Sequence, residues 1–352
     1  MTDLLAATAE LVNFTSVSHH EGPLVDHLEA RLQAVPWLRT ERVGMNLVAR
    51  TELGRATRLV LAGHTDTVPV NDNATARIDG DVLHGLGSAD MKGGLAVFMH
   101  LAETVSSPLV DLTFVFYECE EVAAEFNGLK RLLAERPDLL AGDAAILGEP
   151  TCARIEAGCQ GTMRLELTLN GSRAHTARPW MGRNAIHRLA GVLETLATYE
   201  ERRPVIDGCE FHEVVQAVKV DGGVSGNVVP DRVVLTINHR FAPDRSIAEA
   251  ETHIRHLLGD ELLGDSAALV VEDVAGGAKP SLTHPLLARL GTMVGEAPTA
   301  KLGWTDVAFF AAQGIPAANF GPGDPTIAHT KGELVHRHEI EAVARILTQL
   351  VS

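Results

Sequence analysis

The chain has 352 residues, of which 45% are hydrophobic and 22% charged, the balance of a globular protein large enough for two domains. A formal net charge of −16 argues against nucleic acid or an anionic membrane surface as a partner, because both require basic patches. No hydrophobic run approaches the roughly 20 residues of a membrane span, and the N-terminus does not resemble a signal peptide. The four cysteines show no Cys-x-x-Cys spacing, so we expect a cytoplasmic protein with reduced thiols.

The first 155 residues alternate between predicted helices and strands. Hydrophobic residues at helical spacing predict two opening helices, over residues 4–12 and 24–32. Further along the chain we expect strands at 47–49, 58–62, 112–118 and 144–147, with helices at about 90–105 and 127–136. This alternation is typical of a mainly parallel sheet that is covered by helices on both faces.

From about residue 156 the pattern changes. Met163 to Leu169 alternates hydrophobic and polar residues, as a half-exposed strand does, and Asn170-Gly171 indicates a hairpin or tight turn. The expected elements that follow are a helix at 184–200, strands at 214–220 and 232–240, a helix at 247–258 and a strand at 268–271. The order β-α-β-β-α-β is that of a ferredoxin-like domain.

After Gly276-Gly277 the first pattern resumes, with a helix from residue 284, a strand at 316–320 and a final helix at 337–351. We therefore expect an α/β catalytic domain formed by residues 1–155 and 275–352, with an α+β ferredoxin-like domain, residues 156–274, inserted into it.

Candidate metal ligands follow the predicted strands of the catalytic domain. His64 and Asp66 leave one strand on the same side, so that one can bind a metal while the other orients it. Taken alone, the pair also fits a loop histidine beside a solvated aspartate. Other residues of this kind occur at or near the ends of later elements: Asp90, Glu120, Glu121, Glu149 and His329. Because parallel strands bring their carboxyl ends to one edge, we expect a dinuclear hydrolytic site with nitrogen and oxygen ligands that suit zinc.

Adjacent acids at the end of a strand point to opposite sides, so Glu120 and Glu121 cannot do the same job. One can hold metal while the other transfers protons. A solvated acidic pair that continues through Glu125 is the alternative.

In chain order, these residues lie in segments that resemble the signatures of the aminoacylase and glutamate-carboxypeptidase family of dizinc amidohydrolases. The matching segments are His64 to Pro69, Gly87 to Gly94, Glu120-Glu121, Gly148-Glu149-Pro150 and His329. The resemblance implies two zinc ions, with Co²⁺ or Mn²⁺ as substitutes for one of them, and a homodimer that forms through the inserted domain. It places Asp90 between the ions, His64 and Glu149 on one, and Glu121 and His329 on the other. Glu120 becomes the general base, and Asp66 supports His64.

Within that family, other segments are most similar to the actinobacterial enzymes that act on succinyl-diaminopimelate. They are Gly158 to Thr162, Arg240 to Arg245, Gly303 to Asp306 and Phe320 to Pro325. The resemblance implies hydrolysis of a succinyl amide in lysine and diaminopimelate biosynthesis. It assigns His175 to oxyanion stabilisation, acting from the partner subunit, and Asn227, Arg240, Thr305 and Gly321 to substrate binding. Acetylornithine or a dipeptide as substrate, or a binding protein without catalysis, are the alternatives.

Overall fold

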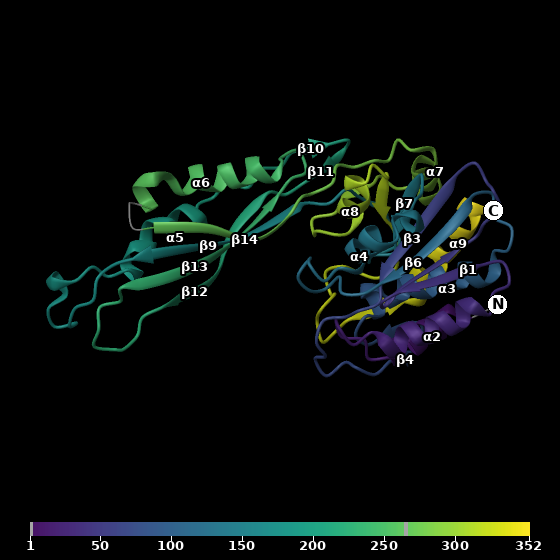
Figure 1. The fold of residues 1–352 in the computed structure, drawn as a ribbon, viewed down its shortest axis with the longest axis horizontal. Helices are drawn as coiled ribbons and strands as arrows, with labels where there is room; N and C mark the ends of the chain where they lie inside the picture. The colour runs from purple at the N-terminus through teal and green to yellow at the C-terminus, as the bar shows by residue number, and fades with distance from the viewer. Residues whose placement is uncertain (1–2, 264–266) are drawn as a thin grey trace. The chain divides into compact units, whose positions relative to one another are not determined.

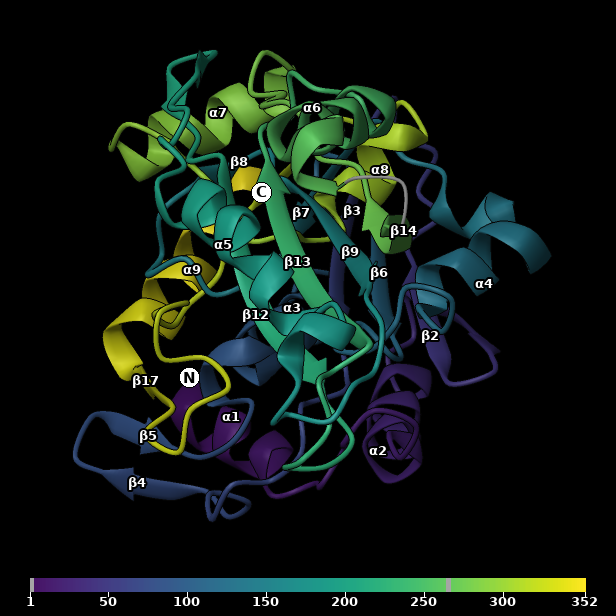
Figure 2. The ribbon, with the colours of Figure 1, turned by 90° about the vertical axis from the view of Figure 1, so that its left-hand side faces the viewer.

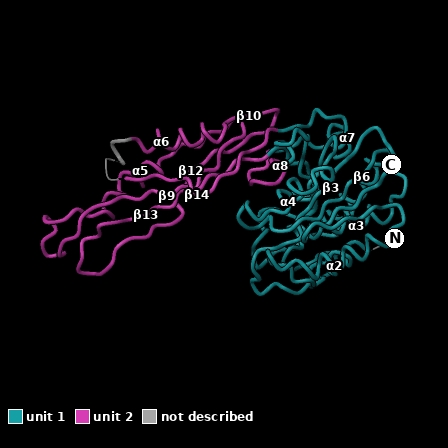
Figure 3. Tube along the Cα trace, viewed as in Figure 1, with its two compact units in different colours: residues 1–158, 280–299, 309–352 teal, residues 159–279, 300–308 magenta. Residues whose placement is uncertain are grey.

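The computed structural model describes residues 3–263 and 267–352, which form two compact units (Figures 1 and 3). Unit 1 comprises residues 1–158, 280–299 and 309–352, and unit 2 comprises residues 159–279 and 300–308. Among the described residues, no helix is both long and hydrophobic enough to cross a bilayer.

Unit 1 is built on an eight-stranded sheet with the order β1-β2-β6-β3-β7-β16-β8-β15. Its centre is parallel, since β3 pairs with β6 and β7 and β7 pairs with β16, whereas β1, β2 and β8 pair antiparallel. The strands are β1 Arg39–Val43, β2 Asn46–Arg50, β3 Arg58–His64, β6 Asp111–Tyr117, β7 Ala144–Leu147, β8 Glu156–Ala157, β15 Thr299–Ala300 and β16 Ala317–Asn319. Residues of β6 and β7 are buried throughout, as expected for strands covered on both faces.

Helices cover this sheet, and side-chain caps mark the start of some of them. Asp3, for example, accepts hydrogen bonds from the amides of Leu5 and Ala6 and so caps the first helix. The helices are α1 Leu4–Val12, α2 Gly22–Gln33, α3 Gly93–Thr104, α4 Gly128–Glu135, α7 Pro285–Val294, α8 Val307–Ala312 and α9 Arg337–Val351, with short turns of helix at Ser88–Lys92 and Pro137–Leu140. The mixed sheet, with its parallel centre and its covering helices, confirms the predicted α/β class.

One predicted helix begins later than expected. The sequence pattern placed its start at about residue 90, but Asp90 has φ −117° and ψ 91°, and α3 begins at Gly93. The amides of Ala89 and Asp90 donate to Glu333 instead of to helical carbonyls, and this holds the segment out of the helix.

A second, three-stranded sheet in unit 1 was not predicted. It pairs β4 (Arg77–Asp79) with β5 (Val82–His84), and β5 with β17 (Leu334–His336), as Figure 2 shows at the lower left. A strand of three residues is too short to show a periodic pattern in the sequence. In addition, β17 is separated from β5 by more than 240 residues along the chain.

Unit 2 has the predicted ferredoxin-like order. Its antiparallel sheet, β12-β13-β9-β14, places the first and third strands of the motif at the centre. The elements are β9 Gly161–Asn170, α5 Leu189–Ala197, β12 Val214–Gly222, β13 Arg232–Phe241, α6 Ile247–Leu263 and β14 Ala267–Ala275, with two short helices at Pro179–Met181 and Ile186–Arg188 and a small hairpin of β10 Val205–Ile206 and β11 Cys209–Glu210.

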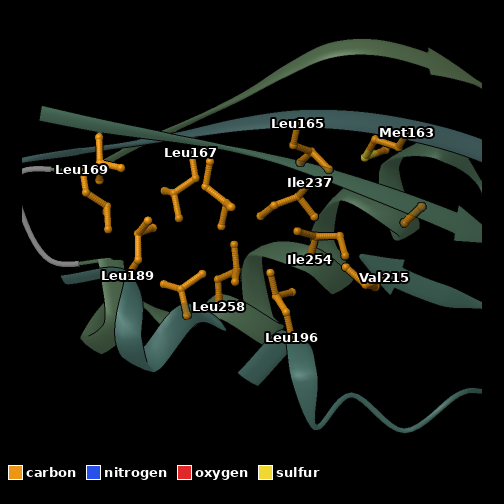
Figure 4. Close-up of a cluster of buried hydrophobic side chains, with 14 of the residues drawn as sticks. Met163, Leu165, Leu167, Leu169, Leu189, Leu196, Val215, Ile237, Ile254 and Leu258 are labelled. Atoms are coloured by element: carbon orange, nitrogen blue, oxygen red, sulfur yellow. The ribbon is translucent and has the colours of Figure 1, made fainter. Parts of the chain in front are cut away.

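Alternate residues of β9 form the core of unit 2. Met163, Leu165, Leu167 and Leu169 are buried and point toward side chains of α5 and α6 (Figure 4). The intervening residues of β9 are less buried, which is the period-two pattern that the sequence shows.

Two details of unit 2 differ from expectation. Asn170-Gly171 does not form a β-hairpin, because β9 pairs with β13 and β14 and not with the next strand along the chain. Gly171 instead lies so close to Arg183 that a Cβ would be 2.0 Å from its carbonyl oxygen. The predicted helix at 184–200 is shorter: Asn184 accepts from two amides of the short helix 186–188, and α5 itself covers only 189–197.

Candidate metal centre

The parallel centre of the unit 1 sheet brings several polar residues to one edge. His64 is the last residue of β3, Glu120 and Glu121 follow the end of β6, and Glu149 follows the end of β7. The interior of each strand is buried, and the candidate ligands lie at its carboxyl end or just beyond it. Side chains at that edge are therefore held by a rigid support.

His64 is fully enclosed and its ring orientation is fixed. Its Nδ1 lies 3.0 Å from the carbonyl oxygen of Asp66, and its Nε2 lies 3.1 Å from Oδ1 of Asp90. The carbonyl accepts the proton on Nδ1, which leaves Nε2 as the atom that can bind a cation. The sequence suggested the carboxylate of Asp66 for this role. Its nearest oxygen is 3.5 Å from Nδ1, so the backbone of the same residue is the closer partner.

The Asp66 carboxylate has a different set of partners. It accepts hydrogen bonds from Ser18 Oγ at 2.7 Å and from the amides of Glu120 and Glu121 at 3.0 and 3.1 Å. Burial disfavours the charged form, but His64, Ser18 and the Glu120 amide together keep the pKa of Asp66 below its usual value. Asp66 thus anchors the turn that carries both acids.

Asp90 belongs to two groups of potential ligands. In one, donor atoms of His64, Asp90 and Glu149 all lie within 4.8 Å of one another, and in the other the same holds for Asp90, Glu121 and His329. A third group joins His64 with Glu120 and Glu121. The shared aspartate means that two cations could occupy adjacent positions.

His329 completes the second group. Its Nε2 lies 2.8 Å from Oε1 of Glu121 and 3.3 Å from Oδ2 of Asp90. Hydrogen bonds to Asp90 and Glu121 raise the pKa of His329 to about 10, against the effect of burial. Burial also opposes the charged form of His64, yet Asp66 and Asp90 raise its pKa well above the usual value. Without a cation, both imidazole rings are therefore protonated on both nitrogens, and their positive charges balance the negative charges of the carboxylates.

Cys119 directly precedes the two acids, and its surroundings disfavour the thiolate form. The residue is 2% exposed, and burial together with Glu21 raises the pKa of its thiol to about 12. All four cysteines are free. A thiol with such a pKa stays protonated near neutral pH.

Two supporting residues were not found from the sequence. Oε1 of the buried Glu333 accepts from the amides of Ala89 and Asp90, both at 3.0 Å, and so fixes the backbone of the shared aspartate. Lys92 is buried and donates to the carbonyl of Phe14 at 2.8 Å, and burial lowers its pKa to about 7. Both residues act through backbone groups, and such contacts leave no motif in the sequence.

Four of the expected substrate contacts belong to unit 2. His175 is exposed, its Nδ1 accepts from the amide of Ala177, and the amide of Thr176 donates to the carbonyl of Asn227, so His175 and Asn227 lie on adjoining segments. Arg240 lies on β13, and within the described ranges it has no ion-pair partner, while burial lowers its pKa. Thr305 is buried, and its carbonyl lies 3.6 Å from Cys159 Sγ.

Gly321 lies in unit 1 against the end of β7. A Cβ at this position would be 2.2 Å from the carbonyl oxygen of Gly148 and 2.5 Å from that of Glu149. This close approach to the segment that carries Glu149 accounts for a glycine here without any substrate contact.

The α/β fold and the two ligand groups that share Asp90 define the class of protein as a metallohydrolase with an inserted α+β domain. Residues 60–352 match the model of peptidase family M20/M25/M40, and the chain belongs to this family. The resemblance seen in the sequence is thereby confirmed.

Relatives and solved structures agree with this assignment. The chain is 49% identical, over 98% of its length and 97% of the relative's, to a Mycobacterium tuberculosis protein provisionally named succinyl-diaminopimelate desuccinylase. It is 43% identical to the succinyl-diaminopimelate desuccinylase of Corynebacterium glutamicum, with 99% and 96% of the two chains covered. A tripeptidase from Staphylococcus aureus has the same fold, with a TM-score of 0.81, 22% identity and 99% and 97% coverage. A dinuclear metal-binding peptidase of family M20 from Bacillus subtilis superposes with a TM-score of 0.70, at 15% identity and 99% and 96% coverage.

The protonated imidazoles generate a prediction about metal binding. At pH 8 the metal-free protein should release about two protons on full metal loading, one from each of His64 and His329, because a ligand imidazole must be neutral.

The pKa of His329 is higher in the folded than in the unfolded chain, and this difference stabilises the metal-free fold. The stabilisation is complete at pH values below the pKa of His329 in the unfolded chain, and it is lost as the pH rises toward 10.

Calorimetric titration with zinc in buffers of different ionisation enthalpy measures the released protons. His329→Gln is the matched variant and should release about one proton fewer. Metal binding without proton release at pH 8 would contradict the assignment.

Proposed function

We propose that this protein is a dizinc amidohydrolase that cleaves N-succinyl-LL-2,6-diaminopimelate to succinate and LL-2,6-diaminopimelate. The names and 43–49% identities of its relatives support the reaction. The observation that carries the chemistry is the pair of ligand groups that share Asp90. A cytoplasmic location, expected from the sequence, stays a prediction.

The donor chemistry fits zinc. Imidazole nitrogen and carboxylate oxygen are ordinary zinc ligands, and both groups present only these atoms. We assign His64 and Glu149 to one ion, Glu121 and His329 to the other, and Asp90 to both. Cobalt or manganese could replace one zinc, because the same donors suit either ion. When bound, the two ions supply Lewis acidity, which acidifies water and polarises the scissile carbonyl.

Glu120 is the proposed general base. Its amide is held by Asp66, and its side chain belongs to a ligand group with His64 and Glu121, so it stands beside the cation positions. Its carboxylate takes a proton from the attacking water and delivers it to the nitrogen of the leaving amine. Both proton transfers require a carboxyl group that lies close to the scissile amide bond and does not itself bind a metal ion.

Unit 2 supplies the proposed substrate contacts. His175 donates to the oxygen that becomes negative as the carbonyl is attacked, and Asn227 binds polar groups of the substrate. Arg240 pairs with a substrate carboxylate. Its guanidinium suits this role, because it is half-buried and has no acidic partner among the described residues. Thr305, also in unit 2, and Gly321, in unit 1, complete the proposed contacts, and both residues are buried.

The roles of the adjacent acids can be separated by substitution. Glu120→Ala should keep two zinc ions and lose turnover by a factor of about 10² to 10⁴, the usual contribution of a general base. Glu121→Ala should instead lose one ion, because it removes a ligand. Metal content measured by atomic emission, beside turnover, distinguishes them. Full zinc occupancy in Glu121→Ala with loss of zinc in Glu120→Ala would reverse the two roles.

Substrate choice is tested with zinc-loaded protein and three amides in parallel: succinyl-diaminopimelate, acetylornithine and a dipeptide. We expect fastest amine release from the first. Arg240→Ala should raise KM for it roughly 10- to 150-fold, which corresponds to a charge-assisted contact of about 1.5–3 kcal/mol. Preference for acetylornithine or the dipeptide would overturn the proposed substrate, and an unchanged KM would remove Arg240 from the site.

We further propose a homodimer in which His175 serves the partner's active site. Strand β12 is an edge of the unit 2 sheet and is exposed over most of its length, including Val218 and Val220. Such an edge can pair with its equivalent across a two-fold axis. His175, also exposed, belongs to the same unit.

Complementation tests the exchange of His175 between subunits. Subunits carrying Glu120→Ala and His175→Ala should each be inactive, whereas an equal mixture that exchanges subunits should regain about a quarter of the parent activity. This follows because half of the dimers are mixed and each mixed dimer holds one intact site. A monomer in sedimentation, or an exchanged mixture without activity, would rule out action across subunits.

A further inference from the structure

A buried carboxylate of unit 2, that of Glu213, has no part in the proposed hydrolysis. The residue directly precedes β12 and is fully buried. Its Oε2 accepts hydrogen bonds from Arg202 Nη2 at 2.7 Å, from Arg245 Nε at 3.0 Å and from the amide of Ala242 at 3.3 Å. Two guanidinium groups and one backbone amide therefore meet at a single carboxylate.

Stability alone is a weak reason for such a network. Transfer of a carboxylate from water to a protein interior costs several kcal/mol, and a buried ion pair often stabilises a fold no more than hydrophobic side chains would. Burial disfavours the charged form of Glu213, but His239 and Arg202 hold its pKa well below the usual value. What the charged carboxylate defines is the arrangement of the segments around it, because each guanidinium meets it in a fixed geometry.

Glu213 and Arg202 together fix the turn that follows β13. Arg202 also binds both carboxylate oxygens of Asp244, at 2.6 and 2.8 Å. The backbone groups of Arg202 and Glu213 pair in both directions, at 2.9 and 3.3 Å, and the amide of Arg245 donates to the carbonyl of Ala242 at 3.1 Å. The turn is therefore held from several sides at the point where the strand ends.

Arg240, the proposed partner of a substrate carboxylate, is the next-to-last residue of β13 and pairs with Val214, the neighbour of Glu213. His239 and Phe241 are fully buried, whereas Arg240 is half-buried, so its side chain points to the other face of the sheet. Glu213 lies on the buried face, since its Oε1 is 3.9 Å from His239 Nε2. The carboxylate therefore acts on Arg240 through the backbone of β13.

We propose that Glu213 is a positioning residue for substrate binding, which holds the end of β13 so that Arg240 meets a substrate carboxylate. The inference rests on the proposed function, in which Arg240 binds the substrate. Arg202 and Arg245 neutralise Glu213 and Asp244, so these two carboxylates are not available to Arg240, which has no ion-pair partner among the described residues.

A double-mutant cycle on the zinc-loaded full chain tests this role. Glu213→Gln should raise KM for succinyl-diaminopimelate at least about fivefold and leave kcat within about twofold, because a displaced contact weakens binding while the metal centre is intact. In the Arg240→Ala background the same substitution should change KM less than about twofold, because the contact that it positions is already absent.

Glu251→Gln, which removes an ion pair with Arg255 on α6, is the matched control and should leave both constants unchanged. A purely structural role of Glu213 would give a different result. Loss of folded protein would lower kcat, leave KM unchanged and act equally in the presence and absence of Arg240.

A second measurement needs no substrate. In isotope-labelled protein, the nuclear magnetic resonance of the Arg240 Nε–Hε group, assigned by its absence in Arg240→Lys, reports the surroundings of the guanidinium. This resonance should shift or broaden in Glu213→Gln and stay in place in Glu251→Gln.

Arg245→Gln decides the matter if Glu213→Gln does not fold, since it removes one donor from the carboxylate and keeps Arg202. It should also raise KM and move the Arg240 resonance. An unchanged KM, effects that multiply in the cycle, or an unmoved resonance would overturn the proposal. Absence of hydrolysis in the parent would instead overturn the proposed function, and the resonance would still decide whether Glu213 positions Arg240.

Discussion

The candidate centre depends on one buried carboxylate, that of Asp66. It accepts from Ser18, from Glu120 and from Glu121, while the carbonyl of the same residue fixes the ring of His64. One residue therefore connects the loop before α2, the end of β3 and the turn after β6. Loss of its carboxylate would leave two amides and a hydroxyl in need of partners at a site where uncompensated polar groups are costly.

Close backbone approach supports the other side of the centre. Cβ atoms at Gly94 and Gly321 would lie 2.3 and 2.2 Å from the same oxygen, the carbonyl of Gly148, which directly precedes Glu149. Helix α3 and the segment after β16 can reach the end of β7 only because these positions have no side chain. This close packing helps to set the position of Glu149.

The sequence predicts those features that repeat along a segment or combine several side chains. Alternation of strand and helix identified the α/β class, and the period-two pattern of β9 identified a half-buried strand. Polar residues after strands or close to other elements identified the six residues that the structure brings together as ligand groups. The role of Asp66 was only partly predicted, since its main partners are amides, which every residue has. The role of Glu333 was not predicted, because it also acts through backbone amides. The three-residue strands β4, β5 and β17 were not predicted because they are too short to show a periodic pattern.

The connections of the inserted unit have a practical consequence for protein engineering. The longer of the two segments of unit 2 runs from Cys159 to Lys279, and near its ends Cys159 and Ala278 form a pair of backbone hydrogen bonds, 2.9 and 3.0 Å long. The two ends of a segment of more than one hundred residues thus meet as neighbours. A short turn could join them after excision, because closing so small a gap costs little chain entropy. Because residues 300–308 also belong to unit 2, an exchange of inserted domains at this junction would have to replace that segment as well.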